Sequence, residues 1–421
     1  MTIQFRCSQC GATETFPDDC AGKTVTCAQC GRKAYVPEGS AASSPRMSDN
    51  ADPPRIARSP RDWLTVVVIA VCVVIVMALF MPALNGIRNR GGRRADCVNN
   101  LSQLVKAAIN FEGRHGRFPG SQELLLEMDP ATVPPDEPGH NKPASWAVVL
   151  LEDLGRADLM ERWNSAVVGA DDPASAPVLN YMRCPSSSAP MESNAVTSYV
   201  ANAGFMPRSW TDPPPFDDYP SALLASQNST NGVFLSRIRE SWMPADWQPP
   251  SVRSADLRDG ESNTILFSEN LAAASWCSFG PLDPLATTFR VNQGWSTDVI
   301  FPAVRNARFG NTFVWCYAHE TNGPALDLGR PEPQIPPEPR MKINGEKRTY
   351  YVADKLGAEV ARPSSGHPGG ANVAFADGRV VFLSDEIAYH VYQQLMTPHG
   401  AKSDMPSRSS YVLRDSDYGG D

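Results

Sequence analysis

The chain has 421 residues, enough for two or three domains, and its 42% hydrophobic and 20% charged residues are ordinary for a folded protein. Its 38 prolines argue against a helical bundle and favour loops and short strands. Residues 1–94 carry a formal charge of +5, so the total of −8 leaves −13 on residues 95–421. So acidic a part is expected to bind nucleic acid poorly, because phosphate contacts need Lys and Arg.

The first 37 residues contain two Cys-x2-Cys-Gly knuckles separated by 16 residues. Four thiolates at this spacing suit tetrahedral Zn²⁺, and so small a module buries too little core to fold without a metal. The predicted cofactor is therefore structural zinc, and its ligands are Cys7, Cys10, Cys27 and Cys30. The alternative to zinc is a pair of disulfides among these cysteines. Cys20 lies outside this set, as a spare thiol or as a ligand that replaces a neighbour.

Three further short sequences accompany the knuckles, namely Phe5, Ala21-Gly22-Lys23 and Val36-Pro37. With them the stretch resembles bacterial zinc-ribbon modules, which implies a zinc ribbon over residues 1–37 and no reaction, because four cysteines leave no open coordination position. Contact with RNA, DNA or a protein stays open, and a protein or no partner is favoured. Residues 38–60 are small, polar and proline-rich, which predicts a flexible linker.

The segment from Trp63 to Leu84 holds no charge and only one strong polar group, Thr65. At 1.5 Å per residue, about 20 such residues span a hydrocarbon core of about 30 Å. We therefore predict a transmembrane helix over residues 61–84. A buried core helix is one alternative, and a secretory signal peptide is another, disfavoured because about 60 residues precede the segment.

Residues 85–114 are predicted to continue this helix and to pack on a C-terminal head. Leu101, Leu104, Val105 and Ala108 follow the i, i+3, i+4, i+7 spacing of an amphipathic helix. Gly91-Gly92 predicts a bend or a break.

The zinc thiolates are the best guide to orientation, since they persist best in a reducing compartment. They predict a single-pass protein of the inner (cytoplasmic) membrane with a cytoplasmic N-terminus and an extracytoplasmic head. The lipid bilayer would then be one partner, with protein partners on either side. Arginines flank the predicted span on both sides, so the positive-inside rule does not decide the orientation.

The head is predicted over residues 115–398 and a disordered tail over residues 399–421. Its clearest local signal is Asp377-Gly378 between two β-rich runs, which predicts a hairpin with a type I′ turn. A short helix is predicted from Ile387 to Leu395.

A set of different short motifs is spread along residues 80–390. They are Pro82-Ala83, Arg93-Arg94, Cys97, Asn99-Asn100-Leu101, Gln103-Leu104, His115-Gly116, Phe118-Pro119, Arg183-Cys184-Pro185-Ser186, Ser198-Tyr199-Val200, Asn202-Ala203-Gly204, Asn231-Gly232-Val233-Phe234, Asp259-Gly260, Ser262-Asn263-Thr264-Ile265, Ser268-Glu269, His367-Pro368-Gly369-Gly370 and Asp377-Gly378. In combination they resemble a large bacterial family of unknown function that has a prepilin-like N-terminal helix and a C-terminal H-x9-D-G motif.

The resemblance implies an α+β fold, in which a long transmembrane helix continues into a pilin-like head with an antiparallel sheet and long loops. Pro60, Arg61 and Thr65 stand where the family has the Gly, Phe and Glu of its prepilin cleavage site. The span is therefore predicted to stay as a permanent anchor, and assembly into a fibre is disfavoured.

Four cysteines lie in the head, and an even number permits two disulfides. The preferred pairing is Cys97–Cys184 and Cys277–Cys316, with four buried thiols as the alternative.

His367 and Asp377 are the residues that an enzyme or a metal site would use. We expect a structural role for them, because one His and one Asp are too few for a closed metal set and no nucleophile elbow accompanies them. A buried pair of Glu269 with His367 is a further hypothesis. The sequence thus predicts a structural or interaction protein rather than an enzyme. The alternative is a module that binds sugars or peptides through tryptophans and loops.

Overall fold

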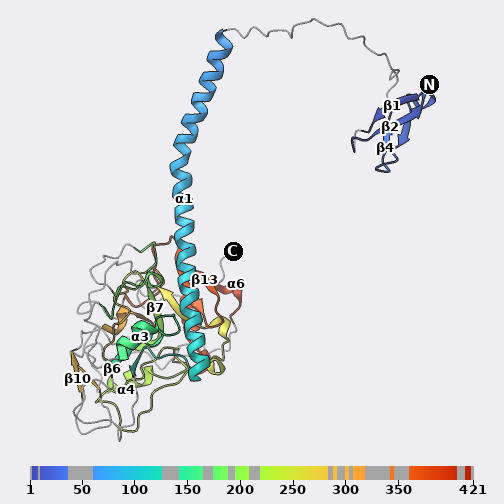
Figure 1. The fold of residues 1–421 in the computed structure, drawn as a ribbon. Coiled ribbons are helices and arrows are strands. Elements are labelled where there is room, and N and C mark those ends of the chain that lie inside the picture. Colours follow the sequence, from blue (N-terminus) through green and yellow to red (C-terminus); the bar gives the residue numbers. More distant parts are fainter. Residues whose placement is uncertain are drawn as a thin grey trace. The chain divides into compact units, whose positions relative to one another are not determined.

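A computed structural model of the chain describes residues 2–7, 10–36, 60–125, 142–164, 174–187, 195–207, 219–282, 288–291, 299–302, 307–317, 342–345, 360–404 and 413–418. The chain divides into two compact units, Met1–Ala78 and Leu79–Asp421 (Figure 1). Except for Pro60, the predicted linker over residues 38–60 lies outside the described residues.

The N-terminal module consists of two antiparallel hairpins. β1 (Thr2–Arg6) pairs with β2 (Thr13–Pro17), and β3 (Thr24–Thr26) pairs with β4 (Lys33–Tyr35). Each knuckle ends in a glycine with positive φ, 73° at Gly11 and 67° at Gly31, a conformation that glycine adopts without steric cost. The chain turns sharply there, which brings the cysteines of the two hairpins together.

A single helix, α1 (Pro60–His115), joins the two units (Figure 1). It continues through Gly91-Gly92, so the helix does not break there as one of the two predicted outcomes required. Two glycines cost a helix about 2 kcal/mol, which the packing of the C-terminal part of α1 against the head helps to offset.

The predicted transmembrane helix over residues 61–84 is wrong. Within the described part of the chain, α1 and the other helices fail the combined requirement of length and apolar character for crossing a membrane. The single-pass inner-membrane location predicted from that helix is overturned with it.

The head contains a five-stranded sheet in the order β11-β7-β8-β12-β13. The strands are β7 (Tyr199–Pro207), β8 (Ile265–Glu269), β11 (Thr312–Tyr317), β12 (Gly370–Phe375) and β13 (Val380–Ser384). β11 runs parallel to β7, whereas the other pairs are antiparallel. The α+β class is therefore confirmed, but the sheet is mixed rather than antiparallel, because the connection before β11 brings the chain back to the same end of the sheet.

The β12–β13 hairpin forms at Asp377-Gly378 as predicted, but its turn is not type I′. Among the described residues Asn344 is the only non-glycine with positive φ, so Asp377 does not adopt the conformation that a type I′ turn needs. Gly378 has φ 90° and its N–H donates to Phe375 O at 3.0 Å, while Phe375 N–H donates to Arg379 O. This arrangement is a turn followed by a glycine bulge.

Shorter elements surround the sheet. They are β5 (Gln122–Leu125), β6 (Lys142–Ser145), α2 (Trp146–Val149), α3 (Ala157–Asn164), α4 (Tyr219–Ser226), β9 (Thr288–Val291), β10 (Val299–Pro302), α5 (Tyr389–Met396) and α6 (Asp415–Tyr418). β5 pairs with β6 and β9 with β10, both antiparallel. The predicted helix near Ile387 is α5, which begins at Tyr389.

Two hydrophobic cores lie on the two faces of the sheet. The first packs the C-terminal half of α1, including Leu101 and Phe111, against Trp146 and Phe267. The second packs α5 against alternate residues of the strands, such as Val200 and Val373. Because side chains alternate along a strand, neighbouring residues such as Tyr199 and Val200 enter opposite cores.

The tail, predicted to be disordered from residue 399, is ordered in its described parts. Residues 400–402 form a 3₁₀ helix, and α6 places Tyr418 against the sheet, where it is 5% exposed. Its hydroxyl donates to Asn263 Oδ1 at 2.8 Å. Aromatic packing and this hydrogen bond explain why a segment without hydrophobic periodicity is fixed.

Candidate functional site

The four predicted zinc ligands come together in the N-terminal module. The Sγ atoms of Cys7 and Cys30 are 3.9 Å apart, those of Cys10 and Cys27 are 3.7 Å apart, and all four lie within 4.8 Å of one another. A tetrahedral ion with metal–sulfur bonds of 2.3 Å needs sulfurs about 3.8 Å apart. The residues thus fit a tetrahedral metal without rearrangement. Cys20 Sγ instead approaches Asp19 Oδ1 at 3.9 Å and is outside the cluster.

Glu14 supports the second knuckle, a role that the sequence did not indicate. Its Oε1 accepts from Cys27 Sγ at 3.1 Å and from Gln29 N–H at 3.2 Å, and its Oε2 accepts from Ala28 N–H at 3.2 Å. The carboxylate crosses from β2 to the turn of the other hairpin. It therefore fixes the position of the second Cys-x2-Cys pair relative to the first.

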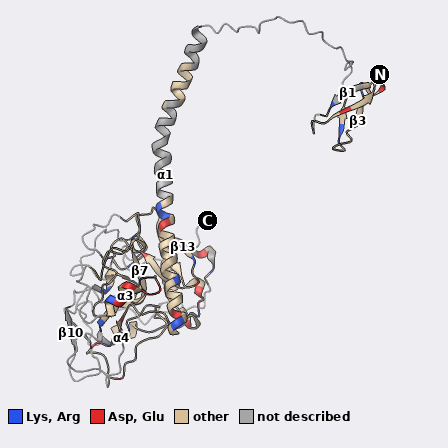
Figure 2. Cartoon of the chain, viewed as in Figure 1, with Lys and Arg blue, Asp and Glu red and all other residues tan. Residues whose placement is uncertain are grey.

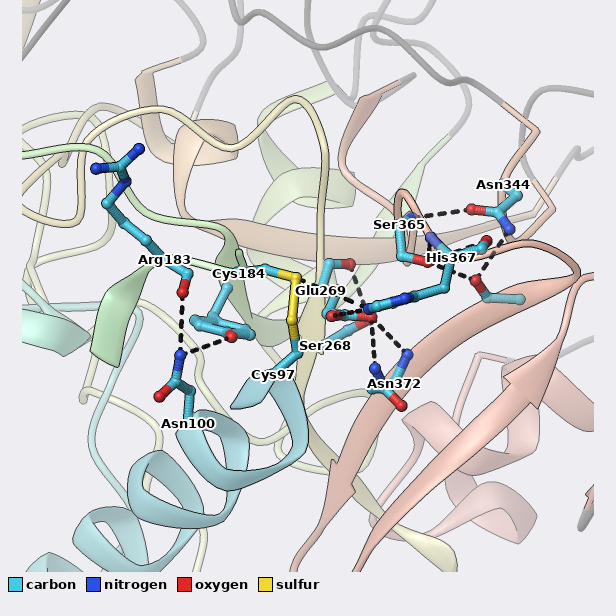
Figure 3. A network of polar contacts seen from close by, with 12 residues as sticks. Cys97, Asn100, Arg183, Cys184, Ser268, Glu269, Asn344, Ser365, His367 and Asn372 are labelled. Atoms are coloured by element: carbon cyan, nitrogen blue, oxygen red, sulfur yellow. Dashed lines mark hydrogen bonds and ion pairs between the residues drawn. A yellow bond between two sulfur atoms is a disulfide. The ribbon is translucent and has the colours of Figure 1, made fainter. Parts of the chain in front are cut away.

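A second cluster lies inside the head, where the predicted Cys97–Cys184 disulfide is confirmed, with Cα atoms 5.1 Å apart (Figure 3). Cys97 is on α1, and Cys184 is on the loop that follows the 3₁₀ helix at Asn180–Met182. The bond ties α1 to the head and is buried at both ends. The second predicted disulfide, Cys277–Cys316, involves a side chain, that of Cys316, which lies outside the described residues.

His367 lies beside this disulfide and faces Glu269. Its Nε2 is 3.3 Å from Glu269 Oε1 and 3.8 Å from Cys184 Sγ (Figure 3). The hypothesis of a buried His367–Glu269 pair is thus confirmed. Asp377 is elsewhere, in the β12–β13 turn, where it pairs with Arg379 at 3.2 Å and accepts its N–H. The two ends of the H-x9-D-G motif therefore have separate roles.

Hydrogen bonds hold Glu269 in place from one side. Its Oε2 accepts from the N–H of Asn372 at 2.8 Å and from Nδ2 of the same residue at 3.0 Å. Asn372 is on β12 and Glu269 ends β8, so the pair spans adjacent strands. The carboxylate is 2% exposed, and an unpaired charge at that depth would be costly.

A polar loop fixes His367 from the other side (Figure 3). Ser365 Oγ accepts from His367 N–H at 3.0 Å and donates to Gly370 O at 2.6 Å. Asn344, in the left-handed conformation with φ 56°, accepts from Ser365 N–H. At Gly370 a Cβ would lie 2.0 Å from Leu383 O, so the motif needs glycine for close contact with β13.

One turn of α1 beyond Cys97, Asn100 makes a second tie. Its Nδ2 donates to Arg183 O at 3.0 Å and to the hydroxyl of Tyr199 at 3.1 Å. Burial raises the pKa of Tyr199 well above its usual range, so the phenol is neutral and its role is structural.

The space beside the cluster is small. A cavity of about 10 Å³, bordered by Cys184, Ser198, Glu269 and Gly366, has room for about one water molecule. Four tryptophans that might have formed a sugar-binding surface are in the core instead: Trp146, Trp163, Trp276 and Trp315. Trp242, at 37% exposed, is near the surface.

Residues 90–390 match the family described as "Protein of unknown function (DUF1559)". The chain belongs to that family. No curated protein and no solved structure matches the chain. The DUF1559 match covers Cys97, Cys184, Glu269 and His367, and it leaves the N-terminal cysteine module outside. The predicted family of unknown function is thereby confirmed, whereas its prepilin-like start and the fusion to a zinc ribbon stay predictions.

Proposed function

We propose that this chain is a structural protein that works by associating with other copies of itself, not by catalysis. The observation that carries the proposal is an apolar stretch of α1 whose side chains are exposed. Val68, Ile69, Val71, Val73 and Ile75 are each about half exposed. In Figure 2 this stretch carries no charged residue.

The stretch is apolar on every side of the helix, because exposed apolar residues occupy nearly consecutive positions. A helix of this kind is stable when other apolar surface surrounds it. The same segment of another copy has matching length and apolar character. Packing of these segments in a bundle would remove most of the exposed surface at about 25 cal/mol per Å².

The buried cluster of the head supports a non-catalytic role. His367 and Glu269 are 7% and 2% exposed and contact each other, Cys184 and Asn372. The adjoining cavity holds about one water molecule, which is too small for an organic substrate. The side chains of the buried cluster join α1, β8 and β12. The buried tryptophans likewise give no support to the sugar-binding alternative.

Zinc is the metal that we infer for the N-terminal module. Four cysteine sulfurs at tetrahedral spacing select zinc or an iron centre, and zinc suits a closed structural site. The ion would hold the two hairpins together and supply no reaction. Metal analysis of the purified chain should find one zinc per chain, lost in Cys27→Ser and retained in Cys20→Ser. Retention of zinc in Cys27→Ser would contradict the inference.

Cys72 gives a direct test of self-association, because its exposed side chain lies within the apolar stretch. Mild oxidation of the zinc-loaded full chain should produce a disulfide-linked dimer through Cys72. The matched variant Cys72→Ser should give none under the same oxidation, and Val68→Asp should reduce the yield severalfold by placing a charge in the contact. Equal dimer yields from the wild-type chain and Cys72→Ser would show that the stretch does not mediate the contact.

A further inference from the structure

We propose that, when the Cys97–Cys184 disulfide is reduced, the buried cluster of the head becomes a second metal site, with Cys97, Cys184, Glu269 and His367 as ligands of Zn²⁺. Each of the four offers one ligand atom, and these atoms all lie within 4.8 Å of one another. Two thiolates, one imidazole and one carboxylate form a donor set that suits a tetrahedral zinc ion.

The geometry outside the disulfide already resembles a loaded site. Tetrahedral zinc with bonds of 2.0–2.3 Å places its ligand atoms about 3.3–3.8 Å apart. His367 Nε2 is 3.3 Å from Glu269 Oε1 and 3.8 Å from Cys184 Sγ. The two sulfurs, which are bonded in this state, have to move apart to reach this spacing.

The lone pairs that a metal needs are directed at the centre of the cluster. Glu269 Oε1 accepts no hydrogen bond from the described residues, whereas Oε2 is held by Asn372. His367 directs Nε2 toward both Cys184 and Glu269, while its backbone N–H is fixed by Ser365. A carboxylate fixed by hydrogen bonds on one oxygen and free on the other is the usual arrangement of an oriented metal ligand.

A water-sized cavity adjoins the cluster. The cavity of about 10 Å³ borders Cys184 and Glu269 directly, and Gly366, on its rim, belongs to an exposed part of the loop. A water-sized space next to two of the four ligands is where an ion would enter. The other cysteine, Cys97, is fully buried on α1.

The conversion is a balanced exchange. A dithiol reductant transfers two electrons and two protons to the Cys97–Cys184 bond, which gives two thiols and leaves the reductant as a cyclic disulfide. Zn²⁺ then replaces the two thiol protons, which pass to solvent, and is bound by neutral His367 and by Glu269. The same structural elements are joined in both states, so α1 remains tied to the head whether the bond is covalent or through the metal.

Zinc binding by the full chain tests this inference. The chain is loaded with zinc, oxidised or reduced with a dithiol, dialysed without oxygen, and analysed for zinc per chain. We expect reduction to add one zinc per chain to whatever the N-terminal module holds. A reduced wild-type chain that gains no zinc would overturn the inference.

Three variants assign the added zinc to this cluster. Cys97→Ser combined with Cys184→Ser, and separately His367→Ala, should gain none on reduction, and Glu269→Gln should bind it at least tenfold more weakly. Asp377→Asn, in the β12–β13 turn, should behave as the wild-type chain does. An equal gain in the double cysteine variant would assign the zinc to other thiols and contradict the inference.

Cobalt gives a readout that remains valid if a variant does not fold. Co²⁺ added to the reduced, zinc-loaded wild-type chain should produce the visible absorption of a tetrahedral ion together with thiolate charge-transfer bands. The oxidised chain should show neither. Absence of both from the reduced chain contradicts a four-ligand site at this place.

Discussion

Asn372 donates from its backbone N–H and from its side-chain Nδ2 to one oxygen of Glu269, and this is how a carboxylate tolerates burial between two strands. Hydrogen bonds to a charged acceptor are about twice as strong as those between neutral groups. The other oxygen faces His367. The residue pair Glu269 and Asn372 thus couples β8 to β12 at the point where the H-x9-D-G loop enters the sheet.

Replacement of Asn372 tests this coupling. Asn372→Ala removes one donor and should lower the free energy of unfolding by about 1–3 kcal/mol. Asn372→Asp has the same shape but places a second carboxylate against Glu269, so the loss should reach about 3–5 kcal/mol at neutral pH. Urea denaturation of the oxidised chain measures both. If Asn372→Asp is as stable as the wild-type chain, the buried carboxylate does not depend on these donors.

The carboxylate of Asp259, in contrast to that of Glu269, is disfavoured by its surroundings. Burial raises the pKa of its carboxyl, although Gly400 N–H donates to Oδ2 at 2.6 Å. The folded chain therefore holds this proton more tightly than the unfolded chain does. The contribution of Asp259 to stability is largest below its ordinary pKa of 3.8 and is lost as the pH rises through the raised value.

Asp259→Asn keeps an oxygen for Gly400 but does not titrate. We expect the variant and the wild-type chain to differ least near pH 3, and the variant to become the relatively more stable of the two as the pH rises towards 7. Unfolding by urea at a series of pH values follows this difference. A difference that stays constant with pH would show that Asp259 is not destabilised by burial.

At the scale of elements, the glycine beside the sheet and the glycine in α1 have different standing. Gly232 and Gly204 bring two backbone segments into contact, and a Cβ on Gly232 would lie 2.2 Å from the Cα of Gly204. Gly92 lies within α1, and a Cβ there has no neighbour within 4 Å. The first glycine is required by packing, whereas the second is only tolerated.

The two glycines give a matched pair of variants. Gly232→Ala should destabilise the head by about 3 kcal/mol or more, because one of two backbones has to move. Gly92→Ala should stabilise α1 by about 1 kcal/mol, since alanine favours helix. Thermal unfolding compares the two with the wild-type chain. Similar unfolding temperatures for both variants would contradict the close contact of Gly232 with Gly204.

Sequence patterns predicted those elements that are specified by residues close together in the chain. Asp377-Gly378 between two apolar runs predicts the hairpin, the periodic leucines predict the packed half of α1, and the knuckles predict the four-sulfur cluster. The turn type was wrong because it depends on the φ of Asp377, which the dipeptide does not fix. Asn344 and Asn372 were missed because their partners are 21 to 103 residues away in the chain.

The sheet order shows the same limit over a longer range. The parallel pair β11–β7 joins residues more than 100 positions apart, and no local pattern specifies the direction in which they meet. The Cys97–Cys184 pairing was found because few cysteines are present, and the role of His367 because the family motif identified it. The membrane helix was predicted from hydropathy alone, and the described residues do not bear it out.

At the scale of the whole chain, a small four-cysteine module comes first, and α1 then leads into a DUF1559 head. The head is closed by a covalent bond and a buried polar network, and its described tryptophans are largely used in packing. Among the described residues, the apolar stretch of α1 is exposed and unlike ordinary protein surface. We therefore propose that the chain functions by association through that stretch.

Sedimentation equilibrium of the zinc-loaded full chain, run beside the double variant Val68→Asp with Val71→Asp, tests this assignment most directly. The wild-type chain should have a mass that is a multiple of its 45.8 kDa and depends on concentration, whereas the variant should remain at 45.8 kDa. The single exposed change Lys106→Glu, outside the stretch, should leave the association unchanged. A wild-type chain that sediments as a 45.8 kDa monomer at all concentrations would contradict the account.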